Sequence, residues 1–79
     1  MQKFAIFPAL MGSDQLLPLD GRWNYDSIRA ACIKQASRLR NLHNSKILRA
    51  EIYNRGISLS SSHKIYEILW DEEDIKYYN

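Results

Sequence analysis

The fold of this chain is decided by residues 24–42, which read NYDSIRAACIKQASRLRNL. Apolar side chains recur here every three or four positions, which is the spacing of one face of an α-helix. Asn24 can cap the first turn, and Asp26 lies near the positive end of the helix dipole. The pattern predicts an amphipathic helix from Tyr25 to Leu42. Its core-facing stripe comprises Ile28, Ala31, Cys32, Gln35, Ala36, Leu39 and Leu42.

Three β-strands are predicted around this helix. Residues 4–7 form a short run of aromatic and β-branched side chains that ends before Pro8. Residues 46–53 and 63–70 alternate between two faces, which is the period of a strand. Residues 54–62 lie between the last two strands and form a loop too long for a two-residue turn.

Two other segments are less regular. Residues 12–24 contain the pair Asp20-Gly21, which is typical of a tight turn. Three leucines in this segment predict a loop that packs against the rest of the chain. Residues 71–79 predict either one helical turn that begins with acidic residues or a fraying tail.

The order of elements predicts an α+β fold of β-α-β-β type, with one helix packed on a three-stranded, mostly antiparallel sheet. We expect the sheet order 1-3-2, in which residues 63–70 form the central strand, antiparallel to both neighbours. The alternative places residues 46–53 in the centre, parallel to the first strand. The connection from the first strand through the helix to the second should be right-handed.

Length and composition limit the class of protein. Seventy-nine residues predict a single domain, residues 1–79, with one thin core. Apolar residues make up 46% and charged residues 25%, as in ordinary globular domains. One cysteine excludes an intramolecular disulfide framework. No apolar run is long enough for a membrane span or a secretory signal, so we expect a cytoplasmic protein.

Charge is unevenly distributed along the chain. Residues 22–64 carry nine basic and two acidic side chains, whereas residues 65–79 carry five acidic and one basic. One interpretation is a solvated surface whose oppositely charged segments attract each other. The other is a basic face for an anionic partner, flanked by the acidic end.

No motif predicts catalysis, a cofactor or a metal. Cys32 lies in the core-facing stripe of the helix and is expected to pack as a small apolar residue. His43 and His63 have no second ligand at metal-binding spacing. Glycine-rich phosphate loops and a serine nucleophile elbow are also missing from the sequence. An enzyme would therefore need a site assembled between copies of the chain.

Six residues are candidates for contact with a partner. Arg29, Ile33 and Arg40 fall beside the core stripe of the helix, with Ile33 as an exposed residue between two arginines. The alternative is that Ile33 packs beneath residues 14–19. Tyr53, with Trp70 or Tyr66, could occupy the sheet face away from the helix, because one helix covers only one face. Alternatively, these aromatic residues complete the core.

These features favour a non-catalytic protein-binding module. In size and lack of motifs the chain is similar to the small inhibitors that phages and mobile elements use, anti-CRISPR proteins among them. That likeness implies a stoichiometric inhibitor of a protein partner, which could belong to a nucleic-acid-handling complex. A homo-oligomer is one version of this hypothesis. The alternative is a small nucleic-acid-binding protein that uses the basic middle segment and the sheet aromatics.

Overall fold

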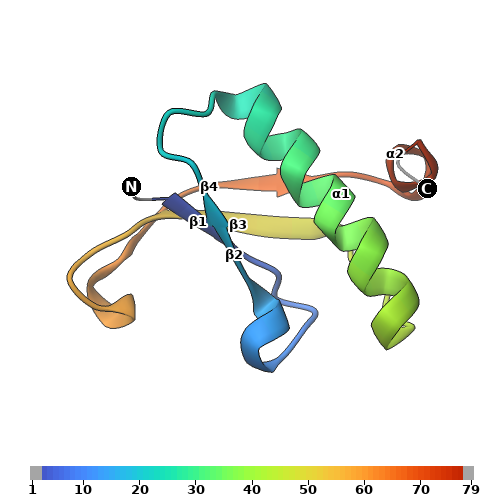
Figure 1. The fold of residues 1–79 in the computed structure, drawn as a ribbon, viewed down its shortest axis with the longest axis horizontal. Coiled ribbons are helices and arrows are strands. Elements are labelled where there is room, and N and C mark those ends of the chain that lie inside the picture. Colours follow the sequence, from blue (N-terminus) through green and yellow to red (C-terminus); the bar gives the residue numbers. More distant parts are fainter. Residues whose placement is uncertain (1–2, 78–79) are drawn as a thin grey trace.

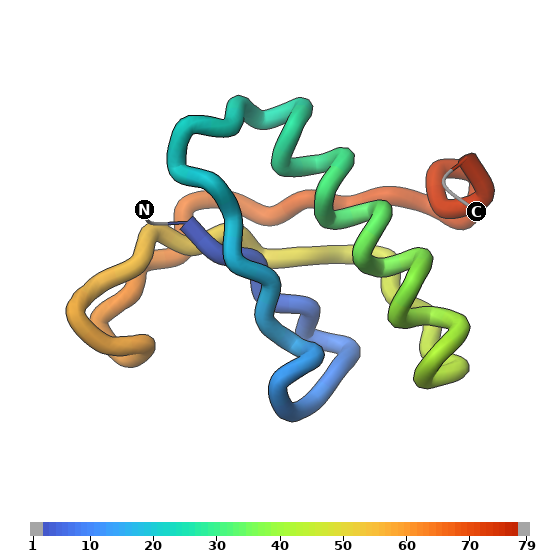
Figure 2. Tube along the Cα trace, in the orientation of Figure 1, coloured from blue at the N-terminus to red at the C-terminus, as the bar shows by residue number. Residues whose placement is uncertain are grey.

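The computed structural model describes residues 3–77, which form a four-stranded sheet with a long helix running diagonally across one face (Figures 1 and 2). The predicted α+β class is therefore confirmed. The strands are β1 (Lys3–Ile6), β2 (Leu16–Leu19), β3 (Arg49–Asn54) and β4 (His63–Leu69). The helices are α1 (Tyr25–His43) and α2 (Glu72–Lys76). Two 3-10 turns, η1 (Gly12–Gln15) and η2 (Leu59–Ser61), precede β2 and β4.

The strand order is β2-β1-β3-β4, and every neighbouring pair is antiparallel. The expected order 1-3-2 in a three-stranded sheet is wrong, because β3 rather than β4 lies beside β1. The alternative correctly placed the strand at residues 46–53 between the other two predicted strands. It was wrong in direction, since β3 runs antiparallel to β1.

The strand β2, which was not predicted, explains why β3 runs antiparallel to β1. In the β1–β2 pair, Phe4 lies opposite Pro18 and Ile6 lies opposite Leu16. Pro18 cannot donate a backbone hydrogen bond, but an edge strand such as β2 tolerates this. The β1–β2 hairpin reverses the chain before α1 begins. The helix therefore returns the chain to β3 in a direction parallel to β2 and antiparallel to β1, so no parallel crossover joins β1 and β3.

The helix α1 begins at the expected cap and ends one residue later than predicted. Asn24 Oδ1 accepts a hydrogen bond of 2.9 Å from the backbone N–H of Ser27. Asn44 adopts a left-handed conformation with φ of 51° and ends the helix. Leu42 was expected in the core stripe but is 70% exposed, because the last turn of α1 extends beyond the sheet (Figure 1).

One buried cluster lies between α1 and the sheet. Its members come from β1, β2, α1, β3, β4, α2 and the segments that join them, and Cys32 is completely buried among them, as predicted. The buried side chains are Ala5, Phe7, Leu10, Leu19, Ile28, Cys32, Ile33, Ala36, Leu39, Ile47, Ala50, Ile52, Ile68, Trp70 and Ile75.

Residues 72–76 form the helical turn that was one of the two alternatives for residues 71–79, of which residues 78 and 79 lie outside the described part of the chain. The Asp71 carboxylate accepts hydrogen bonds from the backbone N–H groups of Glu73 and Asp74, at 3.0 and 3.2 Å. Ile75, on the same short helix, is fully buried. The helix α2 lies beside α1 at the end of β4 (Figure 1).

The face of the sheet opposite α1 has no helical layer among residues 3–77, and we call it the reverse face. Its side chains alternate along each strand with those in the buried cluster. The reverse face comprises Phe4, Ile6, Leu16, Pro18, Arg49, Glu51, Tyr53, Lys64, Glu67 and Leu69.

Candidate functional site

The helix patch expected from the sequence is covered by the C-terminal segment. Of the two interpretations of Ile33, exposure is wrong, because its side chain is fully buried. Arg29 donates a hydrogen bond of 3.4 Å to Asp74, and Arg40 donates one of 3.0 Å to Glu72. The acidic end of the chain therefore pairs with its basic middle, as the first interpretation of the charge pattern expected.

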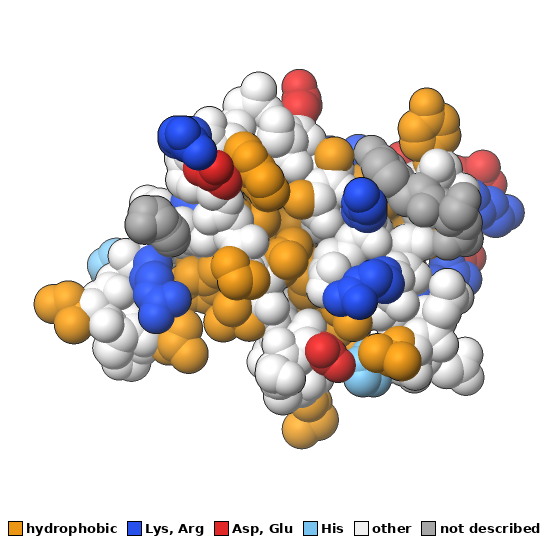
Figure 3. Space-filling view, in the orientation of Figure 1, with side chains coloured by type: hydrophobic (Ala, Val, Ile, Leu, Met, Phe, Trp, Pro, Cys, Tyr) orange, Lys and Arg blue, Asp and Glu red, His pale blue; other side chains and the backbone are white. Residues whose placement is uncertain are grey.

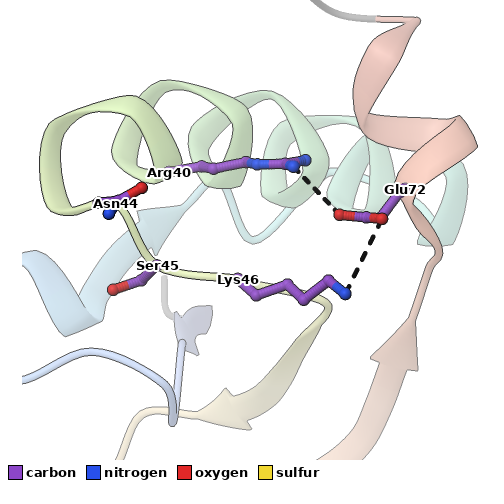
Figure 4. Close-up of a pocket in the computed structure, with 5 residues that line it drawn as sticks. All are labelled: Arg40, Asn44, Ser45, Lys46 and Glu72. Atoms are coloured by element: carbon purple, nitrogen blue, oxygen red, sulfur yellow. Dashed lines mark hydrogen bonds and ion pairs between the residues drawn. The ribbon is translucent and has the colours of Figure 1, made fainter.

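A pocket of about 190 Å³ lies where α1 ends (Figure 4). It is lined by Arg40, Asn44, Ser45, Lys46 and Glu72. The Glu72 carboxylate points between the two cations, 3.0 Å from the Arg40 guanidinium and 3.9 Å from Lys46 Nζ. Ser45 donates its hydroxyl to the backbone carbonyl of His43 at 3.3 Å. These contacts fasten α2 to the end of α1.

Tyr53 lies on the reverse face, where the sequence placed it. Its ring stacks on Phe4 with 5.3 Å between ring centroids and an interplanar angle of 8°. Its hydroxyl donates a hydrogen bond of 3.3 Å to Glu51. Phe4 is only 3% exposed, so Tyr53 forms the outer layer of this aromatic pair. Tyr53 therefore gives the reverse face a partly exposed aromatic ring backed by Phe4.

Charged side chains alternate in sign beside this aromatic pair. Glu51 and Glu67 lie opposite each other in the β3–β4 pair, where like charges destabilise. Arg49 compensates, because its Nη2 contacts Glu51 and its Nε lies 2.8 Å from Glu67, in an ion pair without hydrogen-bond geometry. Lys64 Nζ adds a contact of 3.4 Å to Glu51. These four residues carry two positive and two negative charges, so the cluster is balanced.

Tyr66 and Trp70 do not lie on the reverse face, contrary to the first expectation. Both alternate into the helix side of the sheet, where Trp70 is 6% exposed and its indole N–H donates a hydrogen bond of 2.9 Å to the Ile47 carbonyl. Tyr66 packs against Tyr25 with ring centroids 5.6 Å apart. Burial raises the pKa of Tyr66. These two aromatic residues complete the core, which was the alternative interpretation.

The thiol of Cys32 and the imidazole of His43 lie in different surroundings. Burial raises the pKa of the Cys32 thiol to about 12, so it stays protonated at neutral pH. His43 Nε2 lies 2.7 Å from Asp14 Oδ2 at the surface. Within residues 3–77 there is no group of three or more His, Cys, Asp or Glu side chains that could hold a metal ion. In the same part of the chain no helix has the length and apolar character needed to cross a bilayer.

The loop between β3 and β4 was predicted from the sequence, but its exposed aliphatic side chains were not singled out. This loop projects from the body of the sheet, away from α1 (Figure 1), and hydrophobic side chains mark the same end of the molecule in the space-filling view (Figure 3). Ile57 has a relative exposure of 103%, and Leu59 is 60% exposed. Two aliphatic residues within a serine-rich loop were the available signal.

No protein-family model matches the chain, and no match was found among curated proteins or solved structures.

Proposed function

We propose that this protein is a non-catalytic module that binds another protein through the reverse face of its sheet. The observation that carries the proposal is the composition of this face, which α1 leaves uncovered. Tyr53 and Arg49 are of the residue types that dominate binding energy at interfaces. Leu69 on the same face is 63% exposed. Occupying a partner surface in this way would make the protein a stoichiometric inhibitor or adaptor.

The balanced charges define what kind of partner surface would fit. Arg49 and Lys64 already contact Glu51 and Glu67. The reverse face therefore lacks the strong positive field that would steer a polyanion. Apolar and aromatic contacts would supply most of the affinity, and the ion pairs would set the orientation of the partner.

The alternative, nucleic-acid binding, gains less support from the ion pairs. Five basic side chains of the middle segment contact carboxylates from β3, β4 or the C-terminal segment, and phosphate groups would have to compete with these carboxylates. The five are Arg29, Arg40, Lys46, Arg49 and Lys64. Steep salt dependence of binding to single-stranded RNA or DNA would favour this alternative over ours.

The proposal is tested by photo-crosslinking in the cells where the protein acts. A photoreactive benzoylphenylalanine at position 69 should crosslink to one discrete protein. The same group at position 42 is the matched control, because Leu42 is 70% exposed but lies on α1. With the purified crosslinked protein, Leu69→Lys should weaken binding by about tenfold, whereas Leu42→Lys should not. Equal crosslinking from both positions, or none from position 69, would overturn the proposal.

A further inference from the structure

The loop between β3 and β4, residues 55–62, carries two exposed aliphatic side chains outside the buried cluster. We call it the tip loop. Ile57 is completely exposed and Leu59 is 60% exposed, and neither belongs to the buried cluster. Single exposed aliphatic residues are common on protein surfaces. What distinguishes this pair is the rigid loop that holds it.

Serine hydrogen bonds fix the conformation of the tip loop. The backbone N–H of Ser58 donates to Ser61 Oγ at 3.0 Å, and Ser61 Oγ donates back to the Ser58 carbonyl at 3.0 Å. Ser62 Oγ donates to the same carbonyl at 3.1 Å. It also accepts a bond of 3.0 Å from the Gly56 N–H, which closes the loop at its base.

Gly56 is required by the close approach of these two sides of the loop. A Cβ at this position would lie 2.4 Å from Ser61 Oγ and 2.5 Å from the Ser61 carbonyl oxygen. No other amino acid fits without displacing the backbone of Ser61. The loop is thus ordered before any partner arrives, and ordering before binding removes part of the entropic cost of association.

The charges around the tip loop indicate the chemistry of its partner. The segment from Tyr53 to Tyr66 contains Arg55, His63 and Lys64 but no carboxylate. Lys64 contacts Glu51, whereas no acidic side chain of the described residues lies within ion-pairing distance of Arg55. A surface that accepts this loop should therefore combine an apolar pocket with acidic groups at its rim.

We propose that the tip loop inserts Ile57 and Leu59 into an apolar pocket of a protein partner, and that carboxylates at the pocket rim pair with Arg55. The inference rests on the proposed function, since the tip loop joins the two strands that carry Tyr53, Arg49 and Leu69 on the reverse face. The tip loop is then a second contact with the same partner.

A protein pocket suits this loop better than a lipid surface does. Even one long acyl chain gives only marginal membrane binding, and two aliphatic side chains bury less apolar surface than that. A single unpaired arginine adds little attraction to anionic lipid. In a close-fitting protein pocket the same two side chains can be fully desolvated, which is where interface residues contribute most.

The experiment measures binding of the protein that crosslinks at position 69 to a series of full-length variants. Ile57→Ser and Leu59→Ser should each weaken binding by about tenfold, and the double variant by about a hundredfold. Arg55→Ala should weaken it and reduce its salt dependence. Met11→Ser is the matched control, because Met11 is 89% exposed but lies before η1, and it should bind as the wild type does. All variants should keep the wild-type Tm.

Several results would overturn the inference. If Leu69→Lys weakens binding and the Ile57 and Leu59 variants do not, the tip loop is not a contact, although the proposed function stands. If no variant on either surface weakens binding, or no protein crosslinks at position 69, both proposals fail. Binding to vesicles containing phosphatidylserine that is lost in the double variant would assign the loop to a membrane. A dimer in sedimentation velocity that the double variant dissociates would assign it to a second copy.

Discussion

Replacing Ile75 by alanine tests whether the C-terminal segment is docked as described. Ile75 is fully buried and belongs to the same cluster as Ile33 on α1. Truncating a buried isoleucine to alanine costs about 2–5 kcal/mol, so we take about 3 kcal/mol here. A domain of this size loses roughly 4–8 °C in Tm per kcal/mol, which gives a fall of about 12–24 °C. That is a large part of the stability of a small domain.

The assay is thermal unfolding followed by circular dichroism, with two controls. Leu42→Ala removes an exposed side chain and should change Tm by less than about 2 °C. Asp74→Asn removes the charge that contacts Arg29 but keeps an oxygen for the helix cap. Exposed ion pairs contribute about 0–1 kcal/mol, so its effect should be well below that of Ile75→Ala. A Tm for Ile75→Ala within about 2 °C of the wild type would refute the docking of α2.

Three further changes test other parts of the structure. Gly56→Ala should lower Tm by several degrees and weaken partner binding, because its Cβ would collide with Ser61; an unchanged Tm and affinity would contradict the close approach in the tip loop. Burial raises the pKa of Cys32 from 9.0 to about 12, so the folded state holds the thiol proton more tightly than the unfolded chain does. The free energy of unfolding should therefore fall as pH rises from 9 to 12, and urea titrations of Cys32→Ala should show a smaller fall over the same range. Identical pH profiles of the two proteins would refute this. Trp70→Phe should cost about 1–3 kcal/mol in urea unfolding because the Ile47 carbonyl loses its donor, and no cost would argue against that bond.

The helix and the strands β3 and β4 were predictable because their patterns are long and local, and the apolar run at residues 4–7 indicated β1 to within one residue. Asn24 caps α1 at the expected place. The alternation over residues 63–70 correctly placed Tyr66 and Glu67 on opposite faces of the sheet. Such periodicity is fixed by burial of one face, so it can be identified without knowing the neighbours. The C-terminal helical turn was one of two alternatives because its capping carboxylate, Asp71, is a local signal.

The sheet order was not predictable because it depends on pairing between distant segments. The strand β2 has only four residues and contains Pro18, which resembles a loop when considered alone. Its pairing with β1 reverses the chain before α1 and thereby sets the direction of β3. No local pattern in residues 46–53 carries that information.

Ile33 shows how a short helix such as α2 can alter a binding site expected from the sequence. The position of Ile33 on the helix places it beside the core stripe, where exposure and burial are equally compatible with the pattern. In the structure Ile33 is buried, and α2 lies beside α1 with Asp74 paired to Arg29 and Glu72 paired to Arg40. Charge complementarity between the two segments was the visible signal for this contact.

Amide hydrogen exchange of the full-length protein, with and without the protein that crosslinks at position 69, tests the central claim most directly. We predict that binding slows exchange in β3, β4 and residues 55–62, and leaves the exposed side of α1 unchanged. Slowed exchange confined to α1 and α2, with none in β3, β4 or the tip loop, would contradict binding through the reverse face of the sheet.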